Sequence, residues 1–386
     1  MDFSKIFIKD ACPTKTGGQA VMEGVMMRGP ERTAVAVRLP DDRIFLKTEM
    51  NPKRSALAKL PLVRGVVSFV MSLFLGTKIL TYSADVLEYF TEEEEQKNSS
   101  GNAEEGGDQA DSTGESKSDQ ADSTGESKSD QADGTGESKS GQPDSTAEEK
   151  PGFLERTFGK KTAWNILMFL SVAFALVVSI AVFVLLPTVI MNLLSGTIKN
   201  VVVLNLIEGL LRIAMFIGYI ALISNMKDIR RVFEYHGAEH KTIHCYENGL
   251  ELTPENAKGF IRLHPRCGTS FLMFVMVISL ILFSLLGWPN LVMRIVSRIV
   301  LIPVVAAVSY EILQWAGRST NKFVEIVSVP GLLLQKLTTR EPDASQLEVA
   351  IVSMKAVLVP SETPVFEGIT DTDANFIEPM KIERED

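Results

Sequence analysis

The chain has 386 residues, enough for two or three domains, and 45% of them are hydrophobic. Its formal net charge is −9, but residues 91–150 hold 18 acidic and 5 basic side chains, so the rest of the chain is mildly basic. This composition argues against an acidic enzyme, and the small excess of Lys and Arg elsewhere gives no reason to expect nucleic-acid binding.

Residues 1–55 are predicted to form a small β unit. Residues 33–38 are rich in Ala and Val, residues 43–47 form a second apolar run, and the Pro-Asp-Asp sequence at 40–42 favours a turn between them. The unit has too little sequence for a core of its own, so we expect it to pack on another part of the chain.

The next segment, 56–90, is predicted to be an interfacial or re-entrant apolar helix. Its run from Leu60 to Leu80 is mostly apolar but contains Arg64 and Lys78. Basic residues on both flanks are expected to stay in the cytoplasm, so an ordinary single span does not fit.

Two segments are predicted to be disordered. Residues 91–151 contain an 11-residue repeat starting at Asp108, Asp119 and Asp130, and no aromatic, Val, Ile, Leu or Met side chain occurs in 91–150. Such a tract cannot bury enough surface to offset chain entropy, so we interpret it as a linker, with an acidic docking tract as the alternative. Residues 341–386 are predicted to begin with an amphipathic stretch and to end in a disordered acidic tail.

Residues 152–340 are predicted to form a helical membrane domain, because two uncharged stretches, 162–198 and 267–293, exceed the roughly 20 residues that span a bilayer. Four apolar helices are expected at 163–186, 201–226, 270–288 and 291–315. Glu208 and Arg212 lie four residues apart in the second helix, where they can neutralise each other.

The distribution of basic residues predicts the orientation of this domain. Lys and Arg gather in the loop 227–269 and after the last helix, which places that loop and both termini in the cytoplasm. The predicted fold class is an α-helical integral protein of the cytoplasmic membrane. It has about four transmembrane helices, one interfacial or re-entrant helix, a small N-terminal β unit and a cytoplasmic His-rich loop.

All four histidines of the chain lie in the loop 227–269. His236, His240 and His244 are spaced by four residues, which on a helix places the three rings on one face. The sequence from His236 to His240 also matches H-x-x-E-H, in which two histidines bind zinc and the glutamate, here Glu239, is the general base.

Further ligands are expected from later segments. His264 and Cys267 offer an imidazole and a thiolate. Glu311 is the candidate for a distant third ligand, and the alternative for it is an ion pair with an arginine such as Arg212. The pattern predicts a divalent transition metal, with zinc favoured by the ligand types. The alternative for the whole cluster is a polar loop that satisfies backbone and headgroup contacts.

Longer motifs resemble a known family. They are GGQAVMEGVMMRGP from Gly17, HGAEHK from His236, HPRCGT from His264 and SYE from Ser309. Together they resemble the YqhQ-like family of bacterial membrane proteins, a domain of unknown function described only as predicted metal-dependent enzymes. The resemblance covers about residues 15–90 and 155–340, and it implies a membrane protein with a metal site but no particular substrate.

The resemblance also draws attention to Glu23 and Arg28 in the N-terminal motif. A strand that carries Glu23 among glycines can bring a carboxylate to the metal site, and Arg28 can bind an anionic group. The alternative for both is a salt bridge between the N-terminal unit and a helix.

The leading interpretation is a membrane-embedded metal-dependent hydrolase that acts on a peptide or lipid-linked substrate at the cytoplasmic surface. In this mechanism the metal polarises a water, Glu239 accepts its proton, and Arg28 or Arg266 holds an anionic group. One alternative is a metal-stabilised scaffold or assembly factor without catalytic activity. Another is a transporter for the metal, which the position of the histidines in a basic loop disfavours. The expected partners are the lipid bilayer and an unknown substrate or membrane protein.

Overall fold

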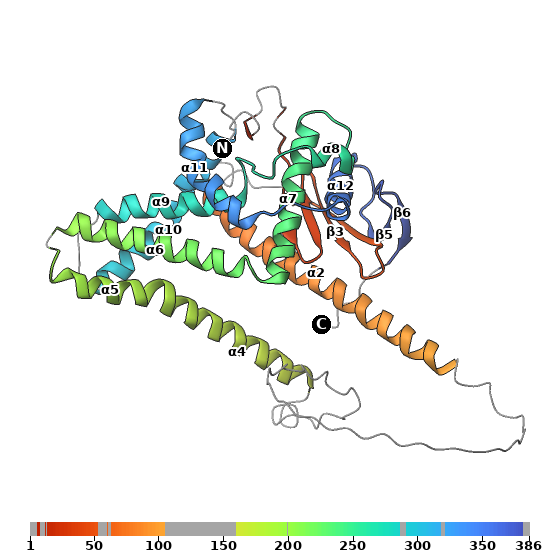
Figure 1. Ribbon diagram of the computed structural model, residues 1–386, viewed down its shortest axis with the longest axis horizontal. Helices are drawn as coiled ribbons and strands as arrows, with labels where there is room; N and C mark the ends of the chain where they lie inside the picture. The colour runs from red at the N-terminus through yellow and green to blue at the C-terminus, as the bar shows by residue number, and fades with distance from the viewer. Residues whose placement is uncertain are drawn as a thin grey trace, which may run out of the picture. The chain divides into compact units, whose positions relative to one another are not determined.

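The computed structural model (Figure 1) describes residues 6, 7, 12, 14–52, 60, 63–104, 160–198, 200–285, 291–317 and 321–380. The chain divides into two compact units, one of residues 98–180 and one of residues 1–97 with 181–386. In the smaller unit the structure describes helix α4 (Lys160–Ile180) and the last turns of α2 (Val63–Glu104). The predicted acidic repeats lie outside the described residues.

Both ends of the chain contribute to one antiparallel sheet with the strand order β1-β2-β3-β4-β5-β6. The strands are β1 (Gly17–Val21), β2 (Gly24–Arg28), β3 (Arg32–Arg38), β4 (Ile44–Met50), β5 (Glu367–Thr370) and β6 (Phe376–Pro379). The first four strands confirm the predicted N-terminal β unit.

Strands β5 and β6 differ from the prediction that the chain ends in a disordered tail. Ile369 of β5 lies opposite Phe45 of β4 and is buried in the same hydrophobic cluster. The Tyr82 hydroxyl donates a hydrogen bond of 2.6 Å to the carboxylate of Glu367. The acidic composition of this segment gave no strand signal. The strands form because β4 supplies their backbone pairing and one buried apolar side chain anchors them.

Helices cover both faces of the sheet, as expected for a unit that cannot bury its own core. Val25 and Met27 of β2 pack toward α7 (Lys227–Glu247) and α12 (Ala344–Leu358), whereas Met26 packs toward α2. Helix α7 therefore lies along one face of the sheet (Figure 1). The covering side chains on the α2 side are Ile79, Tyr82, Val86 and Phe90.

The rest of the larger unit is helical. It holds the π-helical turn η2 (Ala181–Leu185), α5 (Leu186–Ser195), α6 (Val201–Ile223), α8 (Pro254–Lys258), α9 (Gly268–Leu285), α10 (Leu291–Ala316) and α11 (Lys322–Thr338). Among the described residues, four segments are long and apolar enough to cross a membrane. They are Val63–Glu94, Leu170–Leu194, Val201–Ile223 and Gly268–Leu285.

Three of these segments overlap helices predicted to span the membrane. The remaining one lies in α2, whereas the sequence pattern predicted 291–315 instead. Helix α10 does form there, but its apolar part is limited to Val300–Ala316, because Arg294 and Arg298 interrupt the first turns. Helix α2 is continuous from Val63 and extends to Glu104, into residues predicted to belong to the linker. The Glu-rich residues that follow Thr91 are good helix formers, so they prolong the helix.

The two halves of α2 pack against different parts of the unit. Near its start, a side chain at Gly65 would collide with Ala307 of α10, and the Phe69 ring lies 5.4 Å from that of Phe271. Its later residues cover the sheet that also contains β4. The chain thus leaves the sheet after β4 and packs against it again along the second half of α2.

Glu208 and Arg212 form the expected ion pair within α6, with 2.6 Å between Oε1 and Nη2. Glu208 is buried, and the pair lines a small cavity of about 110 Å³ between α6 and α9, together with Asn205 and Ser279. The spacing along one helix therefore predicted the contact correctly.

Candidate metal centre

Helix α7 carries most of the candidate site. Asp228 lies in its first turn, where a negative charge interacts favourably with the helix dipole. At its other end, the Asn248 side chain donates to the carbonyl of His244 (2.7 Å). The structure confirms that His236, His240 and His244 share this helix.

Three ligand atoms converge between α7 and the start of α9. Ring nitrogens of His236 and His240 and Sγ of Cys267 all lie within 4.8 Å of one another, and His236 Nε2 is 3.1 Å from that sulfur. His240 and Cys267 are buried, and His236 is partly buried. Among the described residues, no group hydrogen-bonds the buried Nε2 of His240.

Backbone carbonyls orient both imidazoles. Nδ1–H of His236 donates to the carbonyl of Thr338 (2.7 Å), and Nδ1–H of His240 donates to that of Arg262 (2.6 Å). Gly237 allows this arrangement, because a side chain there would collide with the carbonyl of Arg340, just beyond the end of α11. Because each Nδ1 is bonded to a carbonyl, Nε2 of both rings is directed toward the same space, where it can bind a metal once it is deprotonated.

Electrostatics favour the thiolate form of Cys267. Burial raises the pKa of this thiol, but the adjacent imidazoles of His236 and His240 outweigh it and hold the pKa well below its usual range. Burial lowers the pKa of His236, and the thiolate outweighs that effect and raises it to about 9. The thiolate is the form of cysteine that binds metals.

Glu239 lies beside this group and is buried. Burial raises its pKa, and the two neighbouring imidazoles oppose that effect. The nearby backbone of Gly18 in β1 also lowers this pKa. A Cβ atom at Gly18 would stand 2.9 Å from Cδ of Glu239, so only glycine allows the strand to approach so closely.

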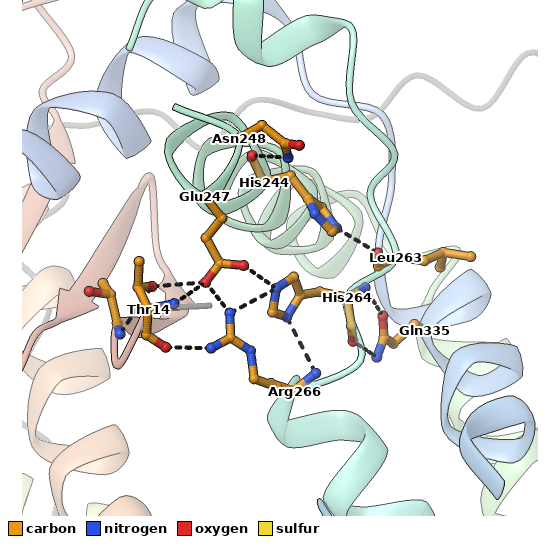
Figure 2. Close-up of polar contacts among 9 residues, drawn as sticks. Thr14, His244, Glu247, Asn248, Leu263, His264, Arg266 and Gln335 are labelled. Atoms are coloured by element: carbon orange, nitrogen blue, oxygen red, sulfur yellow. Dashed lines mark hydrogen bonds and ion pairs between the residues drawn. The ribbon is translucent and has the colours of Figure 1, made fainter. Parts of the chain in front are cut away.

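The other two histidines lie next to the group but make their own contacts (Figure 2). Nε2–H of His244 donates to the carbonyl of Leu263 (3.0 Å), and burial lowers the pKa of His244 to about 4. His264 Nε2 lies 3.8 Å from the carboxylate of Glu247, and its Nδ1 accepts from the backbone N–H of Arg266 (3.3 Å).

Glu247 is a site residue that the sequence reasoning missed. Its carboxylate accepts from the backbone N–H (2.7 Å) and hydroxyl (2.9 Å) of Thr14 and pairs with the guanidinium of Arg266. Burial raises the pKa of Glu247, but hydrogen bonding to His264 and the charge of Arg266 lower it to about 2. Its position seven residues after His240, on the same helix face, was the available signal.

Gln335 of α11 was also missed, and it holds the backbone on both sides of His264. Its side-chain Oε1 accepts from the His264 N–H (2.9 Å), and its Nε2 donates to the carbonyl of His264 (2.8 Å). No pattern in the sequence marks this glutamine.

The remaining candidates lie in other contacts. Glu23, in the turn between β1 and β2, pairs with Arg231 and accepts from the Tyr235 hydroxyl (3.3 Å), which links the N-terminal unit to α7. Glu311 forms a bidentate ion pair with Arg64 of α2. Arg28 ends β2 and is partly buried.

Comparisons with known proteins agree with the motifs. A family model described as a protein of unknown function (DUF1385) matches residues 60–359. An uncharacterised protein of Bacillus subtilis (strain 168), YqhQ, is 32% identical over 363 residues, which cover 91% of this chain and 94% of that protein. No solved structure matches the chain.

Proposed function

The chain belongs to the DUF1385 family, whose description assigns no activity, and from its own site we propose that it is a metal-dependent enzyme of the cytoplasmic membrane. His236, His240 and Cys267 hold a divalent transition metal, and Glu239 is the general base. The reaction class that fits best is hydrolysis of a substrate at the cytoplasmic surface.

The observation that carries this proposal is the buried Nε2 of His240. It finds no hydrogen-bond partner within the described part of the chain, and it faces the same space as His236 Nε2 and Cys267 Sγ. A buried polar atom without a partner costs about 1–3 kcal/mol. A bound cation removes that cost and also explains why both rings are oriented through Nδ1.

The donor set fits zinc best. Two imidazole nitrogens and one thiolate are ligands that zinc accepts, and three protein ligands with an open position are typical of catalytic zinc. When bound, the metal supplies Lewis acidity that lowers the pKa of water and polarises a carbonyl or phosphoryl oxygen.

Glu239 supplies the acid–base chemistry in this proposal. Its carboxylate is buried beside the imidazoles, and burial raises its pKa toward the range in which a base works near neutral pH. An oxygen of Glu239 accepts the proton of an attacking water and returns it to the leaving group. Gly18 of β1 packs closely against this side chain.

The location of the site supports a substrate at the membrane surface. Cys267 immediately precedes Gly268–Leu285, an apolar segment long enough to cross a membrane, and α7 begins shortly after another such segment, Val201–Ile223. The centre therefore lies where two candidate spans end, and a lipid-linked or membrane-anchored substrate reaches such a position directly.

Elemental analysis of the detergent-purified protein tests the metal. We expect about one equivalent of a transition metal in the wild type and almost none in His236→Ala/His240→Ala. His244→Ala is the matched control, because His244 lies on the same helix but donates to Leu263, so its loss is expected to leave the metal content unchanged. A gently purified wild type without metal would contradict the proposal.

A metal-stabilised scaffold is the second candidate. Arg266, the residue expected to hold an anionic substrate, is instead bound to Glu247 and to the Thr14 carbonyl, which favours a structural role for this region. Glu239→Gln separates the two candidates. If the protein is an enzyme, the variant keeps its metal content and melting temperature but loses activity. If it is a scaffold, the variant is silent in every assay, and only removal of the metal lowers the melting temperature.

A further inference from the structure

The chain from Cys12 to Glu23 runs antiparallel to α7 and contacts the helix near its end, its middle and its beginning. The Cys12 N–H donates to the carbonyl of Glu247 at the C-terminal end of the helix (2.9 Å). Gly18 then meets Glu239 near the middle of α7, and Glu23 meets Arg231 near its beginning. We call Cys12 and residues 14–18 the strap.

The ion pair between Glu247 and Arg266, which we call the clasp, holds the first part of the strap. The Glu247 carboxylate accepts two hydrogen bonds from Thr14, and the guanidinium of Arg266 bonds both that carboxylate and the carbonyl of Thr14 (Figure 2). Side chains at 247 and 266 are 6% and 22% exposed, so solvent screens these charges weakly. Arg266 therefore bridges the strap and α7.

The clasp is joined directly to the metal ligands. Arg266 immediately precedes Cys267, and its aliphatic stem fills the space that a side chain at Gly317 would occupy at the end of α10. At the other end of the strap, Gly18 packs closely against the side chain of Glu239. Both ends of the strap thus contact residues adjacent in sequence to ligands of the proposed site.

From this arrangement we infer that Arg266 and Glu247 are positioning residues that hold the strap closed over the metal centre and so limit exchange of the metal with solvent. The inference rests on the proposed function, because it assumes that His236, His240 and Cys267 hold a metal. Opening the strap requires the clasp to break, because Glu247 binds the N–H and hydroxyl of Thr14 and Arg266 binds its carbonyl.

Metal release tests the inference in the full-length, zinc-loaded protein. Arg266→Lys keeps the positive charge beside Cys267. It loses the planar guanidinium, whose N–H groups bond Thr14 and Glu247 at the same time. We expect bound zinc to pass to excess EDTA at least about tenfold faster in Arg266→Lys, and also in Glu247→Gln, than in wild type, because a charge-assisted contact is lost.

Arg38→Lys is the matched control. Arg38 likewise joins a carboxylate, that of Glu348 (2.8 Å), to the backbone carbonyls of Asp42 and Ser345, but it lies away from the strap. We expect its zinc release to stay within about twofold of wild type. Equal release rates in Arg266→Lys and Arg38→Lys, at equal initial zinc content, would overturn the inference.

Hydrogen exchange at the amides of residues 14–18 gives a readout that does not need the metal. We expect faster exchange there in Arg266→Lys and no change in Arg38→Lys. If the wild type binds no zinc, the proposed function fails, and this measurement then decides whether the clasp closes the strap. Unchanged exchange in Arg266→Lys would contradict the clasp in either case.

Discussion

At His240 the two ring nitrogens have different surroundings, and this difference defines the candidate site. Nδ1–H donates to the Arg262 carbonyl, while Nε2 faces His236 and Cys267 without a hydrogen-bond partner from the described residues. The imidazole of His240 therefore donates from one nitrogen and leaves the other nitrogen able to bind a metal.

Glu247 predicts a specific loss of stability in acid. Because its pKa is lowered to about 2 in the folded protein, from the ordinary value of 4.5, its contacts with His264 and Arg266 stabilise the fold fully above pH about 4.5. This contribution, about 3 kcal/mol by linkage, is lost as the pH falls from about 4.5 toward 2. Melting temperatures of wild type and Glu247→Gln are therefore expected to converge over that range. A constant difference between the two proteins would contradict this prediction.

The sequence predicted the ligands on α7 but not the residues that orient them. Histidines spaced by four residues are visible as a pattern, because one helix brings them together. The carbonyls of Arg262 and Thr338 carry no side-chain signature, and Gln335 and Glu247 are single polar residues whose partners lie far away in sequence. Their roles depend on tertiary packing, and the periodicity of the sequence carries no information about which distant segments pack together.

At the scale of elements, helices with local patterns were predictable and their packing was not. The apolar runs predicted α6 and α9 closely, and the Ala- and Val-rich residues 33–38 predicted part of the sheet. The pairing of Arg64 with Glu311 joins α2 to α10 across 247 positions, so no local rule could favour it over Arg212. Arg212 had a nearer partner in Glu208.

Glu311 can be tested as a helix contact or as a metal ligand. In Glu311→Gln we expect unchanged metal content and a small loss in melting temperature, because both side chains of the pair are about one-third exposed. The exchanged variant Arg64→Glu/Glu311→Arg is expected to recover part of that loss in melting temperature. Loss of metal in Glu311→Gln would show instead that the carboxylate is a ligand.

The path of α2 predicts which chain segments share one side of the membrane. β4 and the second half of α2 cover one hydrophobic cluster, so cysteines placed at Glu49 and Glu88 in a Cys12→Ser background are expected to react with an impermeant maleimide from the same side. A cysteine at Gly196, between α5 and α6, is expected to react from the opposite side. Labelling of Glu49→Cys and Glu88→Cys from opposite sides would mean that α2 crosses the bilayer.

At the scale of the whole molecule, the two ends of the chain depend on each other. Strands β1–β4 precede every candidate span, and α12, β5 and β6 follow all of them, yet they form one sheet with its covering helix. Composition predicted that the N-terminal unit needed another part of the chain to pack on. It could not identify that part, because α12 reads as an ordinary amphipathic segment.

Truncation after Pro360 tests this dependence. It removes β5 and β6, exposes Phe45 and Val86, and deletes the contacts of Glu367 with Tyr82 and Lys47. We expect a loss of about 3 kcal/mol or more in stability and a lower melting temperature. A truncation that removes only residues 381–386 is the control, and equal melting temperatures of the two truncated proteins would contradict the role of β5.

The carbonyls that orient the histidines have a consequence for biosynthesis. Arg262, Cys267 and Thr338 are all translated after His236 and His240, and Thr338 follows both α9 and α10. A nascent chain therefore displays two imidazoles long before the groups that fix their tautomers exist. We therefore expect the proposed metal to bind after most of the chain has been translated, rather than to the chain emerging from the ribosome.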